Sequence, residues 1–126
     1  MYLKDLMSYP ISTVKPDATV FDAINAMVSG RKGSVLVTRE GLIKEAEGIV
    51  TTSEIFRKVL SEGKDPKSVR ISDIMTPAPL VTVNLSASPR EAADLMIKHR
   101  IRRLPVIENG ALVGIVTSND LLRCVD

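Results

Sequence analysis

The sequence predicts an α/β (α+β) fold made of two similar units, each with the element order β-α-β-β-α. The first observation is a twelve-residue segment, GIVTTSEIFRKV at 48–59, which returns 66 positions later (114 − 48) as GIVTSNDLLRCV at 114–125, with six of the twelve residues identical. The second is that earlier segments also match, LKDLM at 3–7 with ISDIM at 71–75 and ISTVKPDAT at 11–19 with LVTVNLSAS at 80–88. Two copies of this length are expected to pack together about a pseudo-twofold axis.

The repeat sets the expected domain organisation of the 126 residues. The first copy runs over 1–60 and the second over 69–126, and together they are expected to form one compact module. The segment SEGKDPKS at 61–68 carries the glycine, proline and charge that are typical of an exposed linker.

Each copy opens with a short strand, TV at 13–14 and TV at 82–83, followed by a helix. In the second copy Ser88 is a natural N-cap, with Pro89 at the first helical position and Glu91 positioned to complete a capping box. In the first copy Thr19 and Asp22 supply the cap and Gly30 is the expected stop. The apolar residues recur at helical spacing, Ile24, Met27 and Val28 in one helix and Ala93, Met96 and Ile97 in the other.

A hairpin and a final helix complete each copy. LPVI at 104–107 and ALVGIV at 111–116 are β-rich runs joined by a Glu-Asn-Gly turn, which is a strong hairpin signal. The first copy has SVLVT, a longer connection, and then GIV at 48–50. The final helices are expected over 53–60 and 118–125.

Composition excludes several classes of protein. The apolar runs are far shorter than the roughly 20 residues that cross a bilayer, and the N-terminus lacks the pattern of a secretory signal, so we expect no membrane span and a cytoplasmic location. One cysteine and one histidine provide too few ligands for zinc. No pairing of nucleophile and base, no set of paired carboxylates and no glycine-rich phosphate loop is visible, so we expect no enzymatic activity and no required cofactor.

The segments TTSE at 51–54 and TSND at 117–120 allow two interpretations. In the structural one, Thr51 and Thr117 cap the final helices, although Asp120 is shorter than the residue a capping box prefers, and Gly48 and Gly114 stay unexplained. In the functional one, the threonine hydroxyl and the helix N-terminal amides meet a phosphate, and the acid accepts hydrogen bonds from ribose. Both can hold together.

The pattern Gly-apolar-apolar-Thr-x-x-acid, preceded by RRLPVI and by ISDIMT and present twice, resembles a tandem pair of cystathionine-β-synthase (CBS) domains, a Bateman module. The resemblance covers essentially the whole chain. It implies a non-catalytic regulatory module that binds AMP, ADP, ATP or S-adenosylmethionine in the clefts between the paired copies and acts as an energy or metabolite sensor.

The resemblance also implies roles for residues of the second copy. Asp120 would accept from the ribose hydroxyls, Thr117 would contact the ribose or phosphate, and Arg102 and Arg103 would hold phosphates. The surroundings of the adenine would come from Thr76, Leu80, Val81 and Ile101.

The first copy departs from the pattern, so we expect unequal sites. Glu54 replaces the aspartate, Gly33 and Ser34 replace the arginine pair, and Lys32 replaces Ile101. Fewer cations remove charge-assisted phosphate contacts. Ser8, Ile11 and Thr51 nevertheless keep a second nucleotide site open as a hypothesis, and the arginines of the second copy could serve it.

Two alternatives to the sensor remain. One is a ligand-free scaffold in which the copies build a dimerisation surface. The other is a nucleic-acid binder that uses KHRIRR at 98–103, which the small net charge of +2 and the 3% aromatic content disfavour. The family resemblance further implies a homodimer, a disc of four CBS repeats, and a regulated target that is a separate protein.

Overall fold

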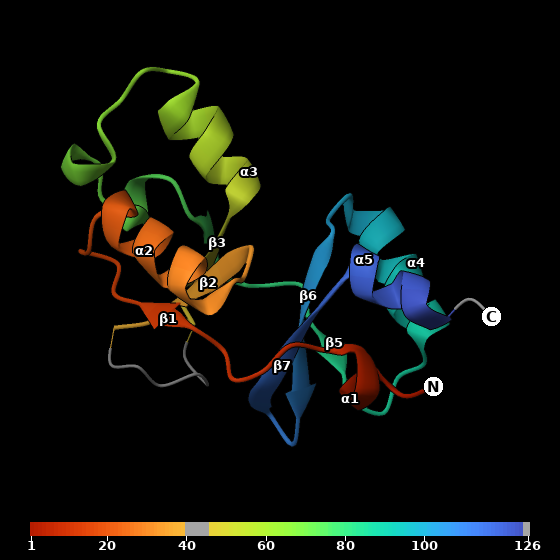
Figure 1. The fold of residues 1–126 in the computed structure, drawn as a ribbon. Helices are drawn as coiled ribbons and strands as arrows, with labels where there is room; N and C mark the ends of the chain where they lie inside the picture. Colours follow the sequence, from red (N-terminus) through yellow and green to blue (C-terminus); the bar gives the residue numbers. More distant parts are fainter. Residues whose placement is uncertain (40–45, 125–126) are drawn as a thin grey trace. The chain divides into compact units, whose positions relative to one another are not determined.

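The computed structural model describes residues 1–39 and 46–124, and the chain divides into two compact units (Figure 1). One unit is Ser12–Leu80. The other combines Met1–Ile11 with the chain from Val81 onward, and is called the Val81 unit below. Both contain a small sheet and helices, which confirms the α/β class.

The Ser12–Leu80 unit is built on a four-stranded sheet in the order β1 (Thr13–Val14), β2 (Ser34–Val37), β3 (Gly48–Thr51) and β4 (Thr76–Pro77). β1 is parallel to β2, whereas β2, β3 and β4 pair antiparallel. The helical segments are α2 (Val20–Gly30), α3 (Thr52–Ile55), the π-helical turn η2 (Phe56–Leu60) and the 3₁₀ turns η3 (Pro66–Ser68) and η4 (Ile71–Asp73). Side chains of α2, α3, η2 and η4 share one core with the sheet, because Val20, Val50, Val59 and Ile71 are all fully buried.

The Val81 unit has a three-stranded sheet in the order β5 (Val83–Asn84), β6 (Arg103–Glu108) and β7 (Ala111–Thr117). Its helical segments are α1 (Leu3–Leu6), α4 (Pro89–His99), α5 (Ser118–Leu121) and the 3₁₀ turn η5 (Leu122–Cys124). β5 is parallel to β6, and β6 forms the predicted hairpin with β7. Asn109 and Gly110 both adopt positive φ, 52° and 80°, as a tight primed turn requires.

The element order β-α-β-β-α is confirmed in each copy, with small differences in the bounds. The first strand of the second copy is at 83–84, one residue later than expected. The final helix of the first copy begins at Thr52, one residue earlier than expected, and that of the second begins at Ser118 as predicted. Each then changes winding, to a π-helical turn after Ile55 and to a 3₁₀ turn after Leu121. The connection at 40–45 and residues 125–126 lie outside the described residues.

The predicted helix caps are present, although one is only partly made. Asp22 N donates to Thr19 Oγ1 at 3.3 Å and Thr19 N donates to Asp22 Oδ2 at 3.0 Å, a reciprocal box at the start of α2. At α4, Glu91 N donates to Ser88 Oγ at 3.1 Å, while the return bond from Ser88 N is not among the hydrogen bonds of the described residues. Gly30 is not the stop: it is the last residue of α2, and Arg31, with φ at 52°, takes the left-handed position that ends the helix.

The two compact units do not follow the two sequence repeats at their starts. LKDLM, which opens the first repeat, forms α1 and buries Leu3 and Leu6 in the core of the Val81 unit. ISDIM, which opens the second repeat, buries Ile71 and Ile74 in the core of the Ser12–Leu80 unit. Each unit therefore takes its leading segment from the other repeat.

The close approach of these leading segments explains Gly48 and Gly114. A Cβ on Gly48 would lie 2.7 Å from both Met75 Sδ and the backbone oxygen of Thr76. A Cβ on Gly114 would collide with Met7 Sδ and lie 3.1 Å from the backbone oxygen of Ser8. Only glycine lets the leading segment lie this near the last long strand of each unit.

Replacing Gly48 by alanine should therefore destabilise the protein. We expect a loss of about 1–3 kcal/mol in the free energy of unfolding, because the clash with the Thr76 carbonyl involves backbone and a rotamer change cannot remove it. Urea denaturation measures the loss. Gly30→Ala is the control, since its nearest foreign atom would be 3.5 Å away. Equal stabilities of the two variants would contradict the steric argument.

Candidate functional site

The turn from β7 into α5 brings Thr117 and Asp120 together. Thr117 N donates to Asp120 Oδ2 at 2.9 Å, and Asp120 N donates to Thr117 Oγ1 at 3.0 Å. The short aspartate thus completes a reciprocal capping box, which answers the doubt raised by its length. Thr117 and Asp120 are both half-buried, so their side chains remain in reach of solvent.

Arg123 connects this turn to the leading segment of the same unit. Its Nη2 donates to the backbone oxygen of Leu6 at 2.6 Å and lies 3.4 Å from Asp120 Oδ1. The second distance is long for a charge-assisted bond, and the arginine side chain is 58% exposed, so this pair is weak. Asp120 Oδ1 is therefore only loosely engaged.

Several predicted site residues surround the same turn. Ser118 N donates to the backbone oxygen of Arg102 at 2.8 Å, and Arg103 is paired with Thr117 across the β6–β7 hairpin. Ser8 exchanges backbone hydrogen bonds with Ile115, two residues before Thr117. Arg102 is exposed and Arg103 half-buried, so the backbones of two arginines adjoin the turn that carries the threonine and the acid. Ile101 and Val81 pack partly buried against the core of this unit, and Ile11 ends its leading segment.

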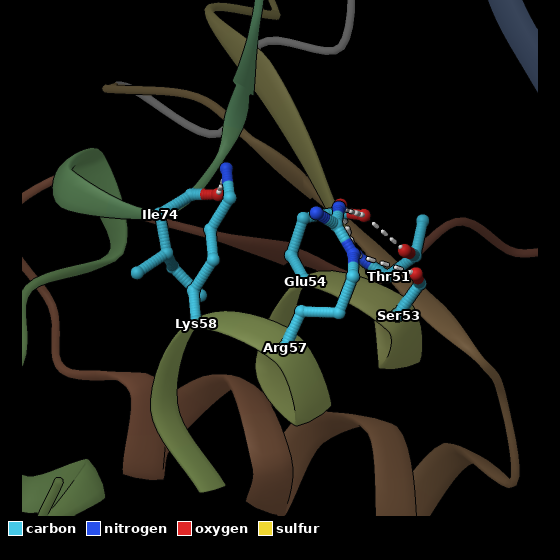
Figure 2. A network of polar contacts seen from close by, with 6 residues as sticks. All are labelled: Thr51, Ser53, Glu54, Arg57, Lys58 and Ile74. Atoms are coloured by element: carbon cyan, nitrogen blue, oxygen red, sulfur yellow. Dashed lines mark hydrogen bonds and ion pairs between the residues drawn. The ribbon is translucent and has the colours of Figure 1, made fainter. Parts of the chain in front are cut away.

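The equivalent turn in the Ser12–Leu80 unit has a different hydrogen-bond pattern (Figure 2). Thr51 N donates to Glu54 Oε1 at 2.9 Å, and the Thr51 hydroxyl donates to Glu54 Oε2 at 2.7 Å. Arg57 Nη2 lies 3.9 Å from Oε2, and its Nε donates to Ser53 Oγ at 3.3 Å. Glu54 is only 6% exposed, so its carboxylate is buried and fully occupied by its own turn.

The remaining predicted residues lie in this second unit. Thr76 is paired with Ile49, two residues before Thr51, in the position that Ser8 holds beside β7. Ser34 is paired with Thr51, and the backbone oxygen of Gly33 accepts from Thr52 N at 3.1 Å, as Arg102 accepts from Ser118. Leu80 is half-buried at the end of the unit. Thr76 and Leu80, expected to act with Thr117, thus belong to the unit that contains Thr51.

Lys58 holds the leading segment of the Ser12–Leu80 unit. Its Nζ donates to the backbone oxygen of Ile74 at 3.1 Å, the residue equivalent to Leu6 (Figure 2). In this unit the acid is contacted by Arg57 and the leading segment by Lys58, whereas in the Val81 unit Arg123 contacts both.

Sequence reasoning missed an apolar groove of about 430 Å³ in the Ser12–Leu80 unit. It lies between α2 and the α3–η2 segment, and the exposure of Val28, Phe56 and Leu60 is the signal that could have indicated it. Its lining consists of Ile24, Met27, Val28, Arg31, Lys32, Thr52, Ile55, Phe56 and Leu60. In the Val81 unit Ile97 and Leu122, at equivalent repeat positions, are also exposed.

Comparison with known proteins identifies the class of domain that this fold and these turns define. The CBS domain model matches residues 3–61 and 71–126. The chain therefore belongs to the CBS domain family and carries two CBS domains in tandem.

Relatives agree with this assignment. The CBS domain-containing protein YhcV of Bacillus subtilis is 34% identical over 119 residues, 94% of this chain and 81% of that protein. The mitochondrial CBS domain-containing protein CBSX3 of Arabidopsis thaliana is 34% identical over 110 residues, 86% of this chain but only 53% of that protein. The chain thus spans about half of CBSX3.

Among solved structures, a hexameric CBS-CP12 protein from bloom-forming cyanobacteria has a TM-score of 0.88 at 33% identity, covering 100% of this chain and 72% of that one. Among the described residues, no helix is both long and apolar enough to span a membrane, and His, Cys, Asp and Glu form no group of three or more that could hold a metal ion. The comparisons support a CBS regulatory module.

The two tethers of the leading segments can be tested separately. Arg123→Gln should raise amide hydrogen exchange in residues 3–8 by about two- to tenfold, because the bond to the Leu6 carbonyl is lost. Lys58→Gln should do the same for residues 71–75. Hydrogen–deuterium exchange with mass spectrometry measures both.

Arg57→Gln is the matched control for Lys58→Gln, because its contacts are with Ser53 and Glu54. It should leave exchange in 71–75 unchanged. A uniform rise across the whole chain in any of the three variants would mean global destabilisation and would contradict a local tether.

Proposed function

We propose that this protein is a non-catalytic regulatory module that binds an adenosine-containing compound, AMP, ADP, ATP or S-adenosylmethionine, and acts through a separate partner protein. The observation that carries the proposal is the turn at Thr117 and Asp120, where a carboxylate oxygen is only loosely engaged and the backbones of Arg102 and Arg103 adjoin the turn. These groups can recognise both a sugar hydroxyl and a phosphate.

The chemistry of the turn supports this ligand class. Ribose hydroxyls are donors, and Asp120 Oδ1, which lies 3.4 Å from Arg123 Nη2, can accept from them. Arg102 and Arg103 offer forked guanidinium donors, which match phosphate oxygens better than a lysine would. Ile101 adds apolar surface in the same unit, suited to a base.

The proposed role is binding, not catalysis. The polar groups at the turn are a hydroxyl, a carboxylate that already caps a helix, and guanidinium groups. Such groups hold a ligand in place, whereas a hydrolytic or transfer reaction needs an activated nucleophile or a metal-bound water.

Regulation requires that the ligand favour one conformation over another. A ribose hydroxyl at Asp120 Oδ1 would compete with Arg123, which also holds the Leu6 carbonyl of the leading segment. Ligand occupancy would therefore change how firmly α1 is held, and that change is what a partner could detect.

An interaction scaffold without a ligand is the second candidate. It is favoured by the exposed apolar side chains at repeat-equivalent positions, Val28 and Phe56 in one unit and Ile97 and Leu122 in the other. Exposed apolar side chains that recur on helices are common at protein interfaces. Self-association to a homodimer is compatible with either candidate, and the related CBS-CP12 protein is a hexamer.

Isothermal titration calorimetry with AMP, ADP, ATP and S-adenosylmethionine at physiological salt tests the proposal. We expect saturable binding of at least one of the four. Asp120→Ala should weaken that binding at least tenfold, because a hydrogen bond to a charged acceptor contributes about 1.5–3 kcal/mol.

Asp94→Ala is the matched control, since Asp94 is exposed on α4 of the same unit and the substitution changes the charge equally. Its affinity should equal that of the wild type. Absence of heat and of thermal stabilisation with all four compounds would reject the sensor and favour the scaffold.

A further inference from the structure

The hydroxyl groups of the two equivalent threonines differ in their hydrogen bonds. The Thr117 hydroxyl oxygen accepts a hydrogen bond from Asp120 N at 3.0 Å. The Thr51 hydroxyl instead donates its proton to Glu54 Oε2 at 2.7 Å. The two turns have the same place in the repeat and a similar backbone, since φ is −112° at Thr117 and −117° at Thr51.

The two turns differ in the hydrogen-bond donors that they leave available to a ligand. A threonine hydroxyl has one proton to donate. At Thr51 that proton is already given to a carboxylate, in the short charge-assisted geometry that is the stronger kind of hydrogen bond. At Thr117 the hydroxyl acts as an acceptor, and among the described residues it donates no hydrogen bond.

The carboxylates of Glu54 and Asp120 also differ in how many of their oxygens accept close hydrogen bonds and in how exposed they are. Both oxygens of Glu54 accept from Thr51, one from the amide and one from the hydroxyl, and its side chain is only 9% exposed. Asp120 uses Oδ2 for the Thr117 amide, leaves Oδ1 at 3.4 Å from Arg123, and has a side chain that is 18% exposed. A buried carboxylate resists losing its partners, because an unpaired charge in that position is costly.

The side chain of Glu54 is one methylene group longer than that of Asp120, and this extra length explains the two hydrogen-bond patterns. The longer side chain of Glu54 turns back far enough for both oxygens to face Thr51, as Figure 2 shows. Asp120 places only one oxygen on the backbone of its threonine, and the threonine hydroxyl then takes the Asp120 amide instead.

We propose that Glu54 blocks ligand binding at the Thr51 turn. Its carboxylate accepts the Thr51 hydroxyl proton, and both of its oxygens already accept hydrogen bonds, so neither is left for a ribose. The Ser12–Leu80 unit is thereby closed to the ligand by its own acid, and the chain binds one adenosine compound, at Thr117 and Asp120. This inference rests on the proposed function, and it makes the identity of the acid, glutamate or aspartate, the determinant of which turn binds.

A reciprocal exchange of the two acids tests the proposal. Asp120→Glu keeps the charge and the capping role but should close the Thr117 turn and weaken binding of AMP, ADP, ATP and S-adenosylmethionine at least tenfold in calorimetry. Glu54→Asp should leave the first site intact and expose a second, weaker site. Circular dichroism and urea denaturation verify that both variants are folded.

A measurement without ligand tests the closed turn directly. A hydroxyl proton that is bonded to a buried carboxylate exchanges slowly with water, so the Thr51 hydroxyl should be visible by nuclear magnetic resonance in the wild type. The Thr117 hydroxyl should be invisible in the wild type and become visible in Asp120→Glu. A Thr51 hydroxyl that exchanges as fast as an exposed one would overturn the proposal without any variant.

The outcomes separate this inference from the function on which it rests. If the wild type binds one compound per chain and Asp120→Glu loses it, both stand. If the wild type binds two per chain, or Asp120→Glu binds like the wild type, the inference is wrong and the function stands. If none of the four compounds binds to the wild type, the proposed function fails, and with it the claim that Glu54 excludes a ligand.

Discussion

The close contact between each leading segment and a strand glycine is the constraint on which the rest of the structure depends. At Gly48 and Gly114 the neighbouring methionine and backbone oxygen occupy the space where any other residue would place a Cβ. That contact allows Thr76 to pair with Ile49 and Ser8 with Ile115, and each paired residue lies two positions before a capping threonine. The glycine therefore fixes where the leading segment runs relative to the turn where the proposed ligand binds.

The same constraint explains why the sequence repeat does not mark out the compact units. A sheet with one strand edge open gains hydrogen bonds by adding a segment, and in each unit that segment comes from the start of the other repeat. Leu3 and Leu6 then bury against one core and Ile71 and Ile74 against the other. Because both units need a leading segment supplied in this way, neither repeat completes its own sheet and core alone.

Local sequence signals predicted most of this fold, and contacts between distant residues account for what they missed. The Asn-Gly turn, the Thr19 cap and the helices α2 and α4 are short-range features, and the structure has them as predicted, although Val28 and Ile97 of the predicted apolar spacing are exposed. The pairing of the leading segments joins residues of different repeats, 27 positions apart for Ile49 and Thr76 (76 − 49) and 107 apart for Ser8 and Ile115 (115 − 8), for which periodicity has no signal. Arg123 and Lys58 looked like ordinary helix charges, because their acceptors, the carbonyls of Leu6 and Ile74, are backbone atoms in those distant segments. For the candidate turns, the sequence indicated the threonine and the acid but not the direction of the hydroxyl, which depends on side-chain reach.

The two units differ in which basic side chains contact the acid and the leading segment. In the Val81 unit one guanidinium group contacts both Asp120 and the Leu6 carbonyl, so the carboxylate and the leading segment share one partner. In the Ser12–Leu80 unit Glu54 is contacted by Arg57 while Lys58 alone holds Ile74, and the buried acid has no loosely engaged oxygen to change. The first acid therefore shares an arginine with its leading segment, whereas the second acid and its leading segment are contacted by different side chains. On this arrangement the Val81 unit is the part of the chain suited to respond, and the Ser12–Leu80 unit is the part suited to stay fixed while it does.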